Sequence, residues 1–151
     1  MAEVLGAEAN ESRICSEALD DEGYVLGYPD ATTKKVAKCA AGGKAYGIAY
    51  KSTKNIITGT AEADKAVAII RAPKKAKVKA YTDASAIAAG DLVSMKGAVA
   101  AGCVKKHAWT AWAAATGTEM AMVVGIAQEA LAASTQGKIE VLLMCPLPIM
   151  Q

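Results

Sequence analysis

Aromatic side chains are scarce in this sequence, which has no phenylalanine and only 5% aromatic residues in a length of 151. Apolar residues reach 53%, but alanine supplies much of that share, so the side chains available for a core are small. A chain of this length suffices for one domain with a core and is short for two. We therefore expect one domain with a thin core, completed by contacts between the subunits of an oligomer.

Long hydrophobic runs are also missing. The apolar runs at 123–124 and 141–144 are short, whereas a membrane-spanning helix needs roughly 18 consecutive apolar residues. The opening residues, Met-Ala-Glu-Val-Leu, lack the basic start and apolar stretch of a secretory signal. We expect a protein that is made in the cytoplasm and has no membrane partner.

Residues that could form a metal or catalytic centre are few and scattered. Cys15, Cys39, Cys103 and Cys145 form no closely spaced pair, and the only histidine is His107. Zinc sites usually draw their ligands from closely spaced pairs, and disulfides are rare in cytoplasmic proteins. No serine lies in a Gly-x-Ser-x-Gly elbow. We predict buried or half-buried free thiols, a structural histidine, no metal, no cofactor and no enzymatic activity.

Negative charge is concentrated at the start of the chain. Residues 1–22 contain seven acidic side chains and a single basic one, although the whole chain has a net charge of +2. The apolar residues in this segment are isolated, which disfavours a core of its own. We predict an extended N-terminal arm over 1–22, followed by a single β domain over 23–151. The arm would contact a partner through Val4, Leu5, Ile14 and Leu19.

Two further apolar segments are candidate docking elements. The C-terminal stretch 145–150 contains two prolines, which cannot donate to a central strand, so we expect it to leave the sheet. Its apolar residues Leu147, Ile149 and Met150 would then need a partner to cover them. Trp109 and Trp112 are the only tryptophans, and either core packing or a subunit interface would suit them.

An internal repeat is the strongest signal in the sequence. Tyr-Gly-Ile-Ala at 46–49 recurs as Val-Gly-Ile-Ala at 124–127. A strand-like apolar run follows each copy, at 66–70 and 139–143, and a proline follows each run. Two units of about sixty residues, near 23–73 and 88–146, therefore share one β motif. We predict a mainly β fold, either a small barrel or a sandwich, built from two pseudo-repeated units.

Local patterns agree with β structure and leave little room for helix. Lys75, Lys77 and Lys79 fall at every second position, which places them on one face of a strand. Together with Lys74 they indicate a solvated strand face, while contact with an acidic protein surface or with nucleic acid remains an alternative. The alanine-rich segments 84–89 and 108–116 are the places where a short helical turn is expected.

The second half of the chain carries a recognisable pattern. It reads Ala-Gly-Asp-Leu-Val at 89–93, Gly-Ala-Val at 97–99, Val-Val-Gly-Ile-Ala at 123–127 and Gly-Lys-Ile-Glu-Val-Leu-Leu at 137–143. This pattern resembles the compact β-barrel decoration, or cement, proteins of tailed bacteriophages and related archaeal viruses. The resemblance covers roughly residues 77–145, about half of the chain. The first unit and the acidic segment at 1–22 are extra relative to that family.

The resemblance implies a structural role without catalysis. It implies a protein of the virion, on the exterior of the capsid, that binds the major capsid protein and stabilises the shell. It further implies a homotrimer and no cofactor. Nucleic acid is disfavoured as a partner because only Tyr81 interleaves with the lysine group.

Lys96 supports an alternative function. Biotin and lipoyl carrier domains present a lysine on a hairpin of a small duplicated β-barrel, and Val-Ser-Met-Lys-Gly at 93–97 has a related form. The residue after Lys96 is Gly97 rather than methionine, which favours an ordinary turn lysine. A carrier or enzyme-accessory barrel using Lys96 is therefore the second hypothesis.

Overall fold

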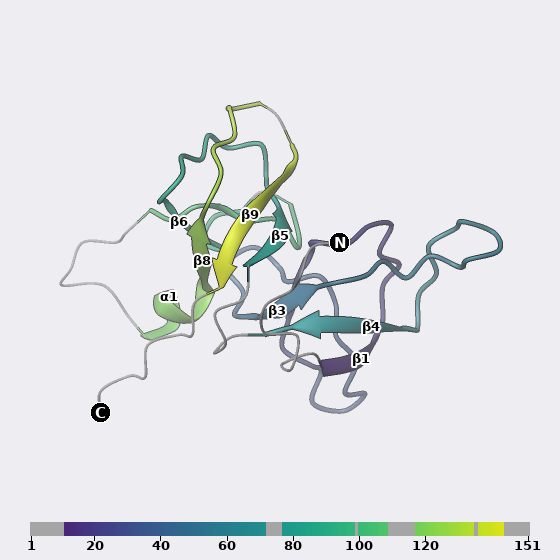
Figure 1. The fold of residues 1–151 in the computed structure, drawn as a ribbon. Helices are drawn as coiled ribbons and strands as arrows, with labels where there is room; N and C mark the ends of the chain where they lie inside the picture. The colour runs from purple at the N-terminus through teal and green to yellow at the C-terminus, as the bar shows by residue number, and fades with distance from the viewer. Residues whose placement is uncertain (1–10, 72–76, 99, 109–116, 135, 144–151) are drawn as a thin grey trace.

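The fold is described by a computed structural model that covers residues 11–71, 77–98, 100–108, 117–134 and 136–143 (Figure 1). These residues form mostly short strands and one short helix. In chain order the elements are β1 (Glu11–Cys15), β2 (Val25–Gly27), β3 (Ala45–Ala49), β4 (Lys65–Ile70), β5 (Lys77–Tyr81), β6 (Leu92–Ser94), β7 (Lys105–Lys106), α1 (Gly117–Met122), β8 (Val123–Ala127) and β9 (Lys138–Leu143).

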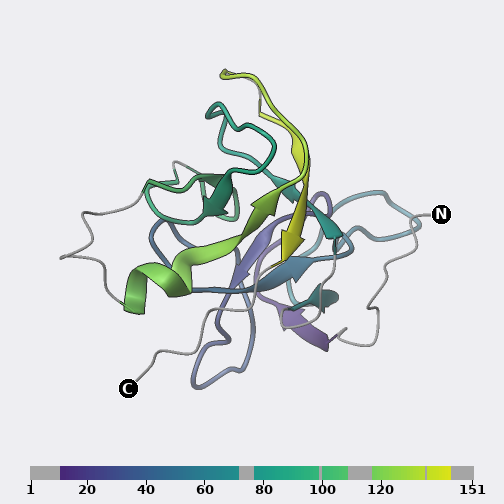
Figure 2. The same ribbon diagram turned by 60° about the vertical axis from the view of Figure 1, so that its left-hand side comes forward.

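The strands build two antiparallel sheets, one from each half of the chain. The first sheet has the order β1-β4-β3-β2 and the second has the order β5-β9-β8-β6-β7. Both views show the two sheets next to each other in the molecule (Figures 1 and 2). The prediction of a mainly β fold is confirmed. Of the two forms left open, the described strands make a sandwich and close no barrel.

The two sheets repeat each other residue by residue. In the first, Gly47 of β3 lies opposite Leu26 of β2, and in the second, Gly125 of β8 lies opposite Val93 of β6. The register shifts at the same place in both pairs, just after Leu26 and just after Val93. A shared bulge changes the twist locally and is hard to reproduce by chance. The pseudo-repeat seen in the sequence is therefore present in the fold.

Hydrogen bonds outside the ladders repeat as well. Ser16 donates its backbone N–H to Val36 at 2.8 Å, and in the second unit Asp83 donates to Val104 at 3.0 Å. Parallel bridges accompany both bonds, between Cys15 and Val36 and between Thr82 and Val104. These correspondences include β1 and β5, so each unit begins earlier than the expected starts at 23 and 88.

Part of the segment predicted as an N-terminal arm belongs to the domain. Residues 11–15 form β1, which pairs along its length with β4. Cys15 and Leu19 are fully buried, so residues 11–22 belong to the domain and do not extend from it. The physical reason is that an edge strand can be built from polar residues when partners elsewhere in the sheet satisfy them. Residues 1–10 lie outside the described part of the chain.

Glycines allow the central strands of each sheet to approach closely. A Cβ atom at Gly47 would lie 2.7 Å from the carbonyl oxygen of Ile70, and one at Gly125 would collide with the carbonyl oxygen of Leu142. Real Cβ atoms do not come that near a backbone oxygen, so only glycine fits at either position. The repeated Gly-Ile-Ala segment thus marks the place where β3 meets β4 and β8 meets β9.

Apolar side chains form two buried clusters. The main core lies between the sheets, and the first unit contributes Val25, Cys39, Ile48 and Ile70 to it. Most of the main core comes from the second unit, for example from Ile139, Val141 and Leu143, which alternate along β9. A second core includes Leu19, Val67 and Ile69. Val67 and Ile69 lie on one face of β4, in the second core, and Ile70 lies on the opposite face, in the main core. The first sheet is therefore covered on both faces.

Among the described residues, the only helix lies outside the two segments where a helical turn was expected. Residues 84–89 are not helical, because Ile87 forms an antiparallel bridge with Leu131. The segment predicted at 108–116 lies outside the described residues except for Ala108. The helix that is described, α1, precedes β8 directly and has six residues. Within the described ranges, no helix is long and apolar enough to cross a membrane.

Candidate docking surface

The structure describes only two of the residues proposed from the sequence as partner contacts. Ile14 lies on edge strand β1 with 40% of its surface exposed, as a docking residue requires. Leu19 is fully buried in the second core, so its assignment to a partner surface is wrong. The remaining proposed contacts lie outside the described residues: Val4, Leu5, Trp109, Trp112, Leu147, Ile149 and Met150.

A loop between β3 and β4 projects from the sandwich. It is closed at its base by an antiparallel bridge between Lys54 and Ala61, and we refer to residues 54–61 as the 54–61 loop. Figures 1 and 2 both show it extending away from the two sheets. The signal for this loop in the sequence was weak, because its two isoleucines resemble the start of another strand.

Asn55 holds the backbone of the 54–61 loop. Its side-chain oxygen accepts the N–H groups of Ile57 at 2.9 Å and Thr58 at 3.4 Å. Its side-chain nitrogen donates to a carboxylate oxygen of Glu62 at 3.0 Å. Its backbone N–H bonds to the carbonyl of Thr60 at 2.9 Å. One residue therefore ties both sides of the loop together, as asparagine often does in turns.

The tip of the 54–61 loop presents two isoleucines to solvent. Ile56 has 101% of its reference surface exposed and Ile57 has 93%. By contrast, the strand residues Ile48, Ile69 and Ile139 are buried. A single exposed apolar residue is ordinary, but an adjacent and fully exposed pair at a projecting tip is a candidate contact site.

The corresponding loop of the second unit, where the structure describes it, presents no pair of large apolar side chains; the exposed neighbours there are Ala132 and Ala133. There Leu131 exchanges two backbone hydrogen bonds with Ile87, at 3.0 and 2.8 Å. Leu131 also packs against the main core. The two units therefore share their ladders and differ at this loop, so the projection in the first unit is not required by the repeated fold.

Positive charge flanks the isoleucine pair. Lys51 and Lys54 are exposed, and neither makes an ion pair with any residue that the structure describes. Glu62, the nearby carboxylate, is already paired with Lys65 at 3.0 Å. The hydrogen bond from Tyr24 lowers the pKa of Asp20, and the charge of Lys54 contributes to that shift. The loop thus combines an apolar tip with a base that carries two exposed lysines, one of which acts on a nearby carboxylate.

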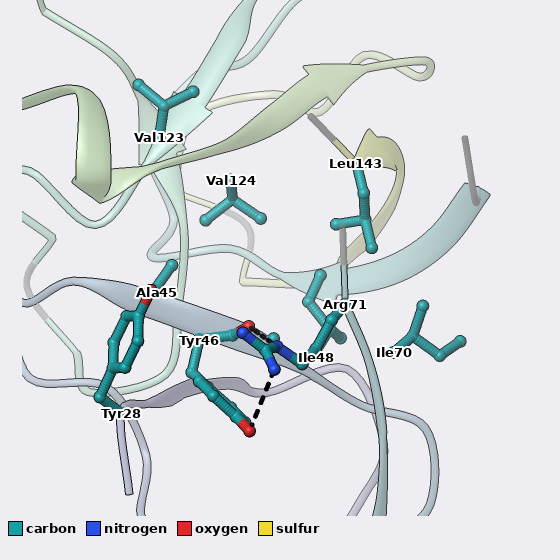
Figure 3. Close-up of a pocket in the computed structure, with 10 residues that line it drawn as sticks. Tyr28, Ala45, Tyr46, Ile48, Ile70, Arg71, Val123, Val124 and Leu143 are labelled. Atoms are coloured by element: carbon teal, nitrogen blue, oxygen red, sulfur yellow. Dashed lines mark hydrogen bonds between the residues drawn. The ribbon is translucent and has the colours of Figure 1, made fainter. Parts of the chain in front are cut away.

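A small cavity lies between the ends of β3 and β4 in the first sheet and the ends of β8 and β9 in the second (Figure 3). Its volume is about 60 Å³, and its walls include Ile48 and Arg71 from the first unit and Val124 and Leu143 from the second. Pockets for drug-sized ligands measure roughly 300–1,000 Å³. This cavity has room for a few water molecules and not for a substrate.

Charged and aromatic groups close one side of that cavity. Arg71 lies over the ring of Tyr46 at 3.8 Å from its centre and donates to Glu11 at 3.1 Å. Tyr46 donates its hydroxyl to the same carboxylate at 2.7 Å. The hydrogen bond from Tyr46 lowers the pKa of Glu11, and Arg13 and Arg71 act in the same direction. This cluster joins β1 to β3 and to the end of β4. These polar contacts stabilise the polar residues of β1 in an edge strand.

A second polar cluster is buried in the second unit. The ring Nδ1 of His107 lies 2.8 Å from the Ser94 hydroxyl, and its Nε2 lies 3.4 Å from Glu119. Burial lowers the pKa of His107, while Glu119 opposes that effect. Ser94 is fully buried, so its hydroxyl has no approach for a substrate. His107 is buried, and its ring joins β6 to the residues after β7 and to α1; that its role is structural stays a prediction.

Lys96 is held within the same cluster. Its Nζ lies 2.6 Å from Glu119 and donates to the carbonyl of Ala108 at 2.7 Å. A carrier lysine has to leave its domain and reach other active sites. The contacts of Lys96 therefore favour an ordinary lysine at a turn over a carrier lysine.

The described cysteines and strand lysines have structural surroundings. Cys15, Cys39 and Cys103 are buried free thiols, and burial raises the pKa of Cys39 to about 11. Cys145 lies outside the described residues.

Lys77 and Lys79 are exposed on β5 and pair with carboxylates of the second unit, as a solvated strand face predicts. Over the described ranges, no group of three or more His, Cys, Asp and Glu residues is placed to hold a metal ion.

No model of a known protein family matches the chain, and no curated protein matches it in sequence.

Proposed function

We propose that this chain is a capsid decoration protein that binds the outside of a viral shell and stabilises it. In this proposal the partner is the major capsid protein, the functional form is a homotrimer and the site of action is the exterior of the virion. The protein acts by binding alone. It adds binding free energy to the assembled shell and none to the dissociated subunits, which shifts the equilibrium toward the shell.

The observation that carries the proposal is the arrangement of the family-like segments. Gly90 adopts a positive φ of 90° and leads into β6, and Asp91 accepts the N–H of Ala88 at 2.8 Å in that turn. The Val-Gly-Ile-Ala segment forms β8, and the Lys-Ile-Glu-Val segment lies in β9. In the second sheet β6, β8 and β9 are neighbours. Segments separated in the sequence thus form one continuous surface, which supports the resemblance to decoration proteins.

The proposal is tested by binding to shells. The chain is mixed with shells assembled from the major capsid protein encoded beside its gene, and bound protein is measured by sedimentation. We expect saturable binding at a fixed ratio to capsid subunits and a higher melting temperature of the decorated shell. Absence of binding at concentrations that saturate known decoration proteins would refute the proposal. Sedimentation equilibrium of the free protein tests the trimer separately.

A further inference from the structure

The 54–61 loop is held in one conformation by its own hydrogen bonds. Asn55 fixes its two sides, and the backbone N–H of Gly59 donates to the carbonyl of Asn55 at 2.8 Å. Isoleucine is stiff about its first side-chain torsion, so Ile56 and Ile57 lose little freedom when they are covered. A preorganised apolar tip binds more tightly than a flexible one because less order has to be created on contact.

The charges near the tip indicate which kind of surface would receive it. Lys51 and Lys54 are exposed and unpaired among the described residues, so a complementary surface carries carboxylates around an apolar hollow. A hollow of the chain itself, next to Ile48 and Val78, has Glu22 and Glu140 at its rim. That rim also holds Lys77 and Lys79, and Glu140 is paired with Lys77. Its mixed charge complements the loop poorly, which favours a different protein over a second copy.

We propose that the 54–61 loop is the docking element of this protein, and that Ile56 and Ile57 enter an apolar, carboxylate-rimmed hollow on the outer face of the major capsid protein. This inference rests on the proposed function and assigns it a specific surface. The docking surface is built on the domain itself, in addition to the chain ends that the sequence indicated. Lys51 and Lys54 then contact the rim while the two isoleucines fill the hollow.

The test compares matched variants on the same shells. Ile56→Ser combined with Ile57→Ser removes the apolar tip without touching the core, because both side chains are fully exposed. Ile56→Leu combined with Ile57→Leu keeps the apolar character. The control is Ala132→Ser combined with Ala133→Ser, at exposed positions in the corresponding loop of the second unit. Thermal unfolding of each variant verifies that the fold is retained.

We expect the double serine variant to bind shells at least about tenfold more weakly, since two buried isoleucines contribute well beyond one decade of affinity. The double leucine variant and the alanine control should bind within about threefold of the wild type, which is the usual range for conservative surface changes. Lys51→Glu combined with Lys54→Glu should weaken binding, and more strongly at low salt than at high salt. Asn55→Ala should weaken binding and speed amide exchange at residues 56–60.

The outcomes separate this inference from the proposed function. If the wild type binds and the double serine variant binds equally well, the loop is not the docking element, although the decoration function stands. If the wild type does not bind shells, both fail. If the serine variant instead loses self-association seen by sedimentation and keeps its affinity for shells, the loop joins copies of the chain, and the inference is overturned in favour of a second copy.

Discussion

At the scale of single residues, stacked tyrosines, a hydrogen bond and an ion pair join the two units at one place. Tyr24 from the first unit stacks on Tyr81 from the second, with ring centres 4.6 Å apart. The hydroxyl of Tyr81 donates to Asp21 at 2.7 Å, and Lys138 pairs with the same carboxylate at 2.8 Å. Asp21 is a residue of the first unit, and both of its partners, Tyr81 and Lys138, are residues of the second unit.

This junction predicts how stability depends on pH. Lys138, and with it Tyr81, lowers the pKa of Asp21 from 3.8 to about 2. Because the folded pKa is the lower one, the unfolded chain binds more protons between these values, and stability falls as the pH drops through that window. Asp21→Asn should lose less stability than the wild type between about pH 5 and pH 2, measured by urea unfolding.

A variant of the tyrosine provides the internal comparison for that prediction. Tyr81→Phe keeps the ion pair between Asp21 and Lys138 and removes one hydrogen bond, so its acid sensitivity should lie between those of the wild type and Asp21→Asn. Equal losses of stability in all three proteins would show that Asp21 does not couple the junction to pH.

At the scale of elements, the closest approach of strands occurs at the repeated glycines. Gly125→Ala should destabilise the fold by about 1–3 kcal/mol, because the new Cβ meets the backbone of β9 and cannot be relieved by rotating a side chain. Gly47→Ala should have an effect of the same sign, since it meets the carbonyl of Ile70. The midpoint of urea unfolding measures both.

Gly137→Ala is the matched control for the strand glycines. A Cβ at Gly137 would lie 3.6 Å from a methyl group of Leu131, which is ordinary van der Waals contact. We expect its unfolding midpoint to stay close to that of the wild type. A similar loss for Gly137→Ala and Gly125→Ala would mean that general glycine replacement, and not the close strand approach, sets the cost.

Elements marked by apolar repeats could be predicted from the sequence, and elements held by polar contacts could not. The Gly-Ile-Ala segments led directly to β3 and β8, because their alternation and their glycines are local signals. Strand β1 was assigned to an arm because Glu11 and Arg13 look solvated in isolation. Their partners, Tyr46 and Arg71, lie far along the chain. No local pattern contains that information.

The same reasoning applies to the candidate docking surface. Ile14 could be identified from the sequence because it is an apolar residue among polar ones. Leu19 looked identical by that criterion, yet it is buried and its backbone N–H bonds to the Thr53 hydroxyl at 2.8 Å. The exposure of Ile56 and Ile57 depends on the loop held by Asn55, which becomes visible only in three dimensions.

At the scale of the whole molecule, the two units depend on each other through the main core. The first unit supplies only four of its buried residues, Val25, Cys39, Ile48 and Ile70, and the second unit supplies the rest. Removing either unit would expose the face that the other covers. The first unit has the second core in addition, built around Leu19, Val67 and Ile69. The duplication is therefore not a pair of independent domains joined by a linker.

This dependence predicts that neither half of the chain folds alone. Units of about seventy residues bury too little surface to be secure without further support, and here each would also lose its shared face. Fragments 1–74 and 75–151, produced separately, should show weak chemical-shift dispersion and no cooperative thermal transition. Mixed in equal amounts, they should recover the dispersed spectrum and the transition of the intact chain, because the contacts across the main core are noncovalent. A cooperative transition in fragment 1–74 alone would show that the second core suffices, and would make the first unit an independent domain.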